Sequence, residues 1–168
     1  MANTNGVEIP SPLNWNNAYN AQDSRQAPLG TKWDDLDPVL GRREFVFVRL
    51  DASSNIPTVG SVVLFKDNYG TVATTKQSDS AYNLVAGVTQ SALTPGSCGW
   101  IQKKGYHSGV LANGDTFAKG DNLQVIGSTD VVVGVKAAGS ALTTAQVGVA
   151  LGASTGSPLM VPAILKIS

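Results

Sequence analysis

The most reactive side chains in this sequence belong to its single cysteine, Cys98, and its single histidine, His107. A cysteine nucleophile needs a base beside it, and this histidine is the natural candidate for that base. The segment around the cysteine, residues 94–105 (TPGSCGWIQKKG), does not match the C-G-[SA]-C-[WY] signature of papain-like enzymes. Its Pro-Gly pair is instead typical of a turn that leads into a strand. We therefore expect Cys98 to be a small buried residue rather than a nucleophile.

The motifs of other common chemistries are absent from the sequence. His107 has no cysteine or carboxylate at zinc-ligand spacing, and there is neither a phosphate-binding glycine loop nor a Gly-x-Ser-x-Gly elbow. The three carboxylates of residues 33–38 (WDDLDP) lack the EF-hand pattern, so we expect a solvated turn there rather than a calcium site. The basic segment 102–107 (QKKGYH) is expected to be a solvated face. We predict no catalytic residue, no cofactor and no metal, and therefore no enzyme.

Composition and charge narrow the range of partners. The 168 residues include 12 basic and 12 acidic side chains, and charged residues make up only 14% of the chain. Nucleic-acid binding draws on a face rich in Lys and Arg, so we expect no nucleic-acid partner. No apolar run reaches the length of about 18 residues that a membrane span needs. The first residues also lack a signal-peptide pattern, so we expect no membrane partner and folding in a cytoplasm.

The first 43 residues differ in composition from the rest of the chain. Residues 1–30 are rich in Asn, Gln, Ser and Pro, and their large apolar side chains stand alone. We interpret residues 1–43 as an extended arm that orders against a partner, with a disordered tail as the alternative. The candidate partner-binding residues are Leu13, Trp15, Tyr19, Trp33, Arg42 and Arg43. The two arginines have a second option, which is to pair with Asp34, Asp35 or Asp37 of the same chain.

From residue 44 onward, short apolar runs alternate with turn signals. No stretch shows the sustained 3.6-residue period of a helix. The expected strands are residues 45–50, 62–66, 71–75, 84–90, 100–104, 107–111, 123–126, 131–136, 147–151 and 159–167. Pro162 marks the last of these as an edge or bulged strand. We predict an all-β fold in which residues 44–168 form a small barrel or sandwich of short antiparallel strands.

A faint repeat runs through this β region. PTVGSVV (residues 57–63) resembles FAKGDNL (residues 117–123), and Gly60 and Gly120 take the same place in the two segments. Gly87 and Gly148 likewise begin similar Gly-Val segments, each followed by a Gly-Ser pair. The two offsets, 60 and 61 residues, are nearly equal. The sequence therefore favours two similar β units, residues 44–105 and 106–168.

The segment LVAGVTQSALTPGSCGWIQKKG (residues 84–105) resembles a pattern of the head decoration, or capsid cement, proteins of tailed phages. PLGTKWDDLDPVLGRREFVFVRL (residues 28–50) resembles the stretch that leads into the first barrel strand of these proteins. The resemblance spans residues 28–155, although Cys98 stands where an aromatic or small residue is common. The matching residues are Gly87, Val88, Gly96, Gly99, Trp100, Ile101, Gln102 and Gly105, followed by Gly148, Val149 and Ala150.

This resemblance implies a structural role in the virion, on the capsid surface. A protein of this kind binds junctions between major capsid protein subunits on the outside of the head and stabilises it, after assembly in the host cytoplasm. The implied partners are the major capsid protein and other copies of the chain, with a homotrimer favoured and a dimer as the alternative. The resemblance implies that the anchors to the capsid or to a neighbouring copy are Trp15, Tyr19 and Trp33. The residues that it places in the core or at an interface are Phe45 and Phe47. The rival hypothesis is a tail, fibre or carbohydrate-binding attachment module in which Trp100 and Tyr106 stack on a sugar.

Overall fold

The computed structural model describes residues 27–75, 84–112, 117–125, 135–137, 146–155 and 159–167. These residues contain ten strands and no helix, which confirms the predicted all-β class. Accordingly, no helix in the described segments is suited to crossing a membrane. The strands are β1 (Lys32–Asp37), β2 (Gly41–Leu50), β3 (Val62–Phe65), β4 (Val72–Thr74), β5 (Val85–Thr89), β6 (Cys98–Leu111), β7 (Asn122–Val125), β8 (Val135–Ala137), β9 (Gln146–Ala150) and β10 (Met160–Lys166).

Five of these strands form a ring in the order β2-β4-β3-β5-β6, in which β6 also pairs with β2. The pairing of β2 with β4 is parallel, and the other four pairings of the ring are antiparallel. Each strand of the ring contributes to one buried apolar cluster, which includes Val48, Val63, Ala73, Ala86 and Ile101. The ring is therefore a small barrel whose interior is filled by aliphatic side chains.

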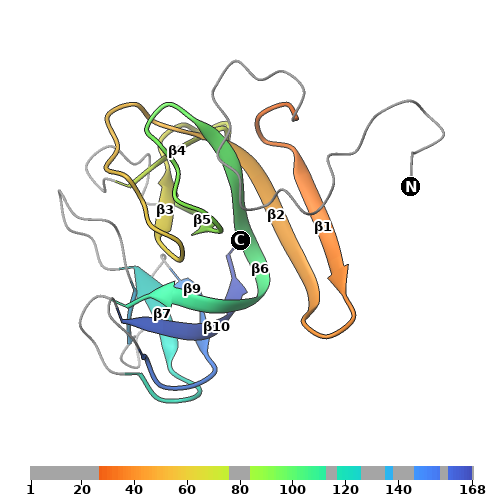
Figure 1. Ribbon diagram of the computed structural model, residues 1–168, viewed down its shortest axis with the longest axis vertical. Helices are drawn as coiled ribbons and strands as arrows, with labels where there is room; N and C mark the ends of the chain where they lie inside the picture. The colour runs from red at the N-terminus through yellow and green to blue at the C-terminus, as the bar shows by residue number, and fades with distance from the viewer. Residues whose placement is uncertain are drawn as a thin grey trace.

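The second half of β6 leaves the barrel (Figure 1). It continues the sheet in the order β6-β10-β9-β7-β8. Gly105, with a φ of 89°, lies where β6 changes partners. A side chain at this position would overlap the carbonyl oxygen of Arg42, so the crossing of β2 and β6 requires glycine. A second apolar cluster joins the two halves, because it holds Val62 and Val88 of the barrel together with Leu123 and Val161.

The two halves of the chain have equivalent hydrogen bonds. Gly60 N donates to Thr89 O at 3.0 Å, and Gly120 N donates to Ala150 O at 2.8 Å. In the β3–β5 ladder, Val63 pairs with Gly87 next to a register shift. In the β7–β9 ladder, Leu123 pairs with Gly148, and this pair also lies next to a register shift. The strand order β2-β6-β5-β3-β4 of the first half corresponds to β6-β10-β9-β7-β8 of the second. The glycines that suggested a repeat in the sequence thus occupy matching structural positions.

The structure differs from the strand predictions at two places. Residues 100–104 and 107–111 were expected to be two strands separated by Gly105, and they form the single strand β6. Of the two alternatives predicted for the strand that contains Pro162, the bulged one is confirmed, because Pro162 lies at a register shift of β10, a strand flanked by β6 and β9. Residues 33–38 were predicted to be a solvated turn within the arm, but all of them except Pro38 belong to β1.

The predicted domain boundaries also fall inside strands. The limit between the arm and the β domain, after residue 43, lies within β2, and the limit between the two units lies within β6. Strand β2 begins at Gly41 because the β1–β2 hairpin continues the ladder beyond the barrel. Residues 1–26 of the predicted arm, with Leu13, Trp15 and Tyr19, lie outside the described residues.

Candidate interaction surface: the β1–β2 hairpin

The β1–β2 hairpin is the element that carries the described members of the predicted contact set. Six residue pairs hold its two strands together, from Lys32↔Val46 to Asp37↔Gly41. Its turn is fixed by Asp37, whose Oδ1 accepts the backbone N–H groups of Val39 and Leu40, each at 2.8 Å. These two bonds lower the pKa of the Asp37 carboxyl, so the turn keeps its ionised acceptor at neutral pH. The short polar side chain therefore shapes the tip.

Both arginines of the predicted contact set pair with carboxylates of the hairpin itself. Arg42 Nη2 lies 2.7 Å from Asp34 Oδ2 on the exposed face. Arg43 forms an ion pair with Asp35, to which its Nε also donates at 3.1 Å, and its Nη2 lies 3.7 Å from Asp37. The Arg43 guanidinium also lies 5.7 Å from the centre of the Phe45 ring. The two arginines thus brace the hairpin from within, which was one of the two options left open by the sequence.

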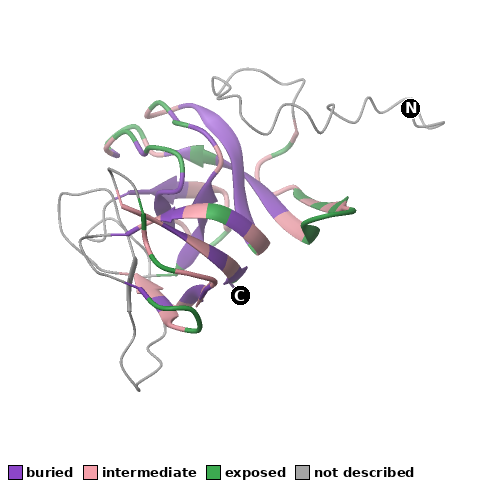
Figure 2. Cartoon of the chain, turned by 60° about the horizontal axis from the view of Figure 1, so that its bottom comes forward, coloured by how far each residue is buried: buried purple, intermediate pink, exposed green. Residues whose placement is uncertain are grey.

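The tip of the hairpin exposes aliphatic side chains to solvent. Leu36 is 80% exposed and Val39 is 87% exposed, and Leu40 is partly exposed beside them. Figure 2 shows exposed residues gathered on this hairpin, which extends away from the barrel. Sequence reasoning missed these residues, although Val39 and Leu40 carry a usable signal as apolar residues placed between Pro38 and Gly41 in a turn. A rigid hairpin with an apolar tip is suited to contact with another protein.

Trp33, the third described member of the predicted contact set, packs on its own chain. It lies partly buried against an aromatic cluster formed by Phe45, Phe47, Cys98 and Trp100. Phe47 and Trp100 have ring centroids 5.1 Å apart at an interplanar angle of 54°. Phe45 and Phe47 are buried, as expected for core residues. Trp33 therefore fixes β1 to the barrel. Its contact with a partner stays a prediction.

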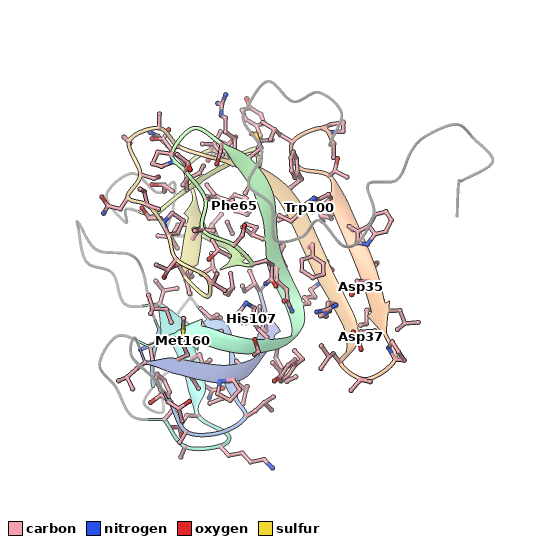
Figure 3. All side chains as sticks on the ribbon, viewed as in Figure 1. Asp35, Asp37, Phe65, Trp100, His107 and Met160 are labelled. Atoms are coloured by element: carbon pink, nitrogen blue, oxygen red, sulfur yellow. The ribbon has the colours of Figure 1, made fainter. Side chains whose placement is uncertain are left out.

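Cys98 and His107 lie in separate environments on β6 (His107 is labelled in Figure 3). Cys98 is buried in the aromatic cluster, and burial raises the pKa of its thiol, so the sulfur is protonated at neutral pH. His107 is also buried, and burial lowers the pKa of its imidazole to about 4. His107 is fixed by backbone groups: its Nδ1 accepts from Gly109 N at 3.1 Å, and it is hydrogen-bonded to the backbone of Thr89. A protonated thiol and a constrained imidazole do not form an activated nucleophile.

One sequence prediction about this strand is wrong. Residues 102–107 were expected to be a solvated face, yet Gln102, Lys103 and His107 are buried, and Lys104 is the one residue of the six that is classed as exposed. Gln102 Nε2 donates to the carbonyl oxygens of Lys104 and Tyr106, at 2.9 Å each. The amide thereby satisfies backbone carbonyl groups at the place where the pairing of β6 with β2 ends. Within the described part of the chain, no three potential metal ligands lie together.

Comparison with family models, with curated proteins and with solved structures finds no match to this chain.

Proposed function

We propose that this chain is a structural virion protein that decorates the outside of a phage capsid and stabilises it by bridging major capsid protein subunits. The sequence pattern of residues 84–105 and 28–50 supplies the family resemblance behind this proposal. The observation that carries it structurally is the β1–β2 hairpin, with its braced stem and its exposed tip of Leu36, Val39 and Leu40. Adhesion of this kind needs a rigid body and an apolar plug, and many weak contacts on one shell add up through avidity.

The fold supports this role because its rigidity comes from several sources. The aliphatic interior of the barrel, the shared second core and the aromatic cluster under β1 fix the hairpin to the body. A hairpin whose ion pairs are already formed loses little conformational freedom when it binds. The major capsid protein and neighbouring copies of this chain, as a trimer or dimer, are the partners that we propose.

The rival role as a sugar-binding attachment module receives less support. Its proposed platform needs an exposed Trp100, and that side chain is 5% exposed because it packs on Phe47. Tyr106 is only partly buried, but a single ring gives a sugar one stacking surface.

The decisive experiment mixes purified protein with expanded empty capsids of the phage that encodes it and measures bound copies per capsid. We expect saturable binding by the native chain and a higher temperature of DNA release from filled heads. The double variant Leu36→Ser, Val39→Ser should lose at least tenfold in affinity, because it removes the two most exposed side chains of the apolar tip and replaces no buried side chain.

The matched control is the double variant Ile56→Ser, Val59→Ser, which changes two exposed aliphatic residues away from the hairpin. It should bind as the native chain does. Absence of native binding to capsids, together with loss of host adsorption in phage lacking the gene, would favour the attachment module instead. If both double variants bind capsids as tightly as the native chain does, the decorating role stands, but the hairpin tip is not the surface that contacts the capsid.

A further inference from the structure

Two separate surfaces hold most of the large apolar side chains that this protein exposes. One is the hairpin tip, with Leu36, Val39 and Leu40. The other is a pocket of about 280 Å³ beside the barrel, where Tyr69 is 89% exposed and Leu84 is 50% exposed. Five of the seven exposed large apolar residues in the described part of the chain lie on these two surfaces. Such a concentration of apolar side chains indicates that both surfaces make contacts in an assembly.

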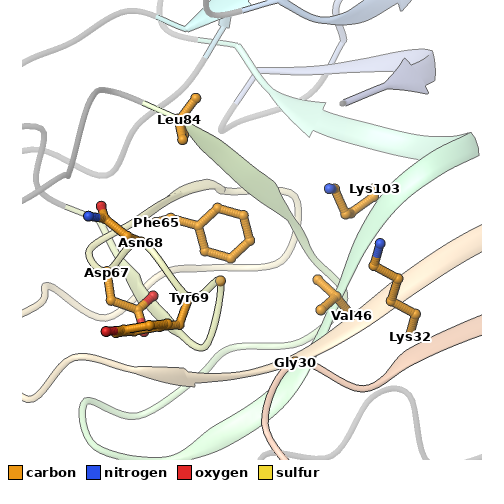
Figure 4. Close-up of a pocket in the computed structure, with 10 residues that line it drawn as sticks. Gly30, Lys32, Val46, Phe65, Asp67, Asn68, Tyr69, Leu84 and Lys103 are labelled. Carbon is orange, nitrogen blue, oxygen red and sulfur yellow. The ribbon is translucent and has the colours of Figure 1, made fainter.

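The shape and lining of the pocket suit an apolar group. Figure 4 shows the Phe65 ring with Leu84 on one side of it and Tyr69 on the other. Phe65 packs against the barrel interior, and Val46 belongs to that interior. The pocket therefore continues the apolar core outward to solvent. Because a cavity of about 150 Å³ can hold a benzene molecule, the volume of this pocket suits one or two aliphatic side chains.

The turn that begins at Asp67 holds one side of the pocket in place. Asp67 Oδ1 accepts the backbone N–H groups of Thr71 at 3.0 Å and Val72 at 3.1 Å. Gly70, with a φ of 70°, brings the turn against Phe65, since a Cβ at this glycine would lie 3.6 Å from the ring. The pocket is therefore formed before anything binds, and little conformational freedom is lost when it is filled.

A chain cannot place its hairpin tip in its own pocket. Lys32 and Val46, the first pair of the hairpin ladder, line the pocket. The last pair is Asp37 and Gly41, and the tip lies beyond it. In a strand, the five steps from Lys32 to Asp37 span about 17 Å. Figure 3 shows Asp37 well apart from Phe65. A hairpin tip that fills the pocket must therefore come from a second copy.

The charges near the two surfaces favour such a contact. Residues 33–43 of the hairpin hold three aspartates and two arginines, which leaves one negative charge in excess. Lys32 offers an exposed positive charge at the pocket, where the Asp67 carboxylate is bonded to its own turn. Lys103 also lines the pocket, but Glu44 acts on its charge within the same chain. Exposed charges of this kind orient two approaching copies more than they hold them together.

We propose that the hairpin tip of one copy inserts into the pocket of a neighbouring copy, with Leu36 and Val39 against Phe65. Tip and pocket are different surfaces, so the contact is head-to-tail and can close a ring. Each contact is small, and ring closure makes several of them act together. The inference rests on the proposed function, which makes neighbouring copies partners, and it names the surfaces that join them. A tip variant then loses capsid affinity because separate copies lack the avidity of a ring.

The test measures the molar mass of the full chain without capsids, by sedimentation equilibrium over about a hundredfold range of concentration. We expect reversible association of the native chain. The tip variant Leu36→Ser, Val39→Ser and the pocket variant Tyr69→Ser, Leu84→Ser should each raise the dissociation constant roughly tenfold or more, because each loses apolar contact area. The four replaced side chains are exposed, so the fold should be unaffected.

A mixture of the two variants tests the direction of the contact. Each variant keeps the surface that the other has lost, so an equimolar mixture should form mixed dimers. These dimers should not grow, because only an inactive tip and an inactive pocket remain unpaired. A symmetric contact between two tips would not be restored by mixing. The control Ile56→Ser, Val59→Ser changes exposed residues outside both surfaces and should associate as the native chain does.

Four results would overturn the inference: a native chain that stays monomeric at every concentration, a tip or pocket variant that associates as tightly as the native chain, a mixture without mixed dimers, or a control variant that is equally impaired. The proposed function can fail separately. A monomeric chain that binds capsids would keep the decorating role and overturn the head-to-tail contact. Associated copies that do not bind capsids would keep the contact and overturn the decorating role.

Discussion

At the scale of single residues, the most informative side chain is His107, the one candidate that the sequence offers for a base beside a cysteine nucleophile. His107 is enclosed between the backbone of Thr89 and Gly109, and Arg43 contributes a further positive charge nearby. Burial, followed by Arg43, disfavours the imidazolium and lowers the pKa from 6.5 to about 4. A sequence shows that a histidine is present but not the dielectric around it. The lowered pKa of His107 could therefore not be predicted from the sequence.

The protonation of His107 predicts an acid-dependent loss of stability. Its folded-state pKa lies below the unfolded value, so the unfolded chain binds the proton more tightly. The contribution of neutral His107 is complete above pH 6.5 and is lost as the pH falls toward about 4. The free energy of unfolding, measured by urea denaturation at several pH values, should fall by roughly 3 kcal/mol over this window from this group. His107→Gln should remove this fall, because a glutamine has no titrating group, and a variant that keeps the full pH dependence would contradict the assignment.

At the scale of elements, most strands were predictable because their signal is local. Runs such as residues 62–66 and 147–151 combine β-branched residues with flanking turn residues, and they match β3 and β9 within one residue. Strand β1 was missed because its sequence, KWDDLD, has low strand propensity. It is stabilised by partners across the ladder, Arg42 and Arg43, and by packing of Trp33 on the aromatic cluster. The register shift between β2 and β6 at Lys103 was not predictable either, since it depends on pairing between segments that are distant in the sequence.

The close approach of the β9 and β10 backbones at Gly148 leads to a prediction about stability. A side chain on Gly148 would overlap the carbonyl oxygen of Ile164, and one on Gly87 would lie 2.9 Å from the carbonyl oxygen of Gln102. Gly148→Ala must therefore separate two paired strands, and we expect a loss of about 1–3 kcal/mol in the free energy of unfolding. Gly152→Ala is the control, because its new methyl group would meet only Pro162 at an ordinary distance of 3.7 Å. Denaturation midpoints that fall equally in both variants would refute the close approach.

At the scale of the whole molecule, two equivalent halves share one strand and one core. The repeat could be seen in sequence through its glycines, but the closure of the first half into a ring could not. The ring depends on the parallel contact of β2 with β4, which joins Arg49 to Val72 and Leu50 to Ala73. Such a contact between short segments has no signature in a single sequence. The second core, with Val62 and Leu64 of the first half and Leu123 and Val147 of the second, makes each half depend on the other.

This shared core predicts that the protein unfolds in one cooperative step. Leu123→Ala leaves a cavity in the second half, and we expect a loss of about 2–5 kcal/mol. The chain's three tryptophans, Trp15, Trp33 and Trp100, all precede the second half, so tryptophan fluorescence reports on the first half and the arm. The fluorescence midpoint in urea should nevertheless shift together with the circular dichroism midpoint. Leu36→Ala, at an exposed position, should shift neither. An unchanged fluorescence midpoint beside a lowered circular dichroism midpoint would show that the two halves unfold independently, and that the shared core does not couple them.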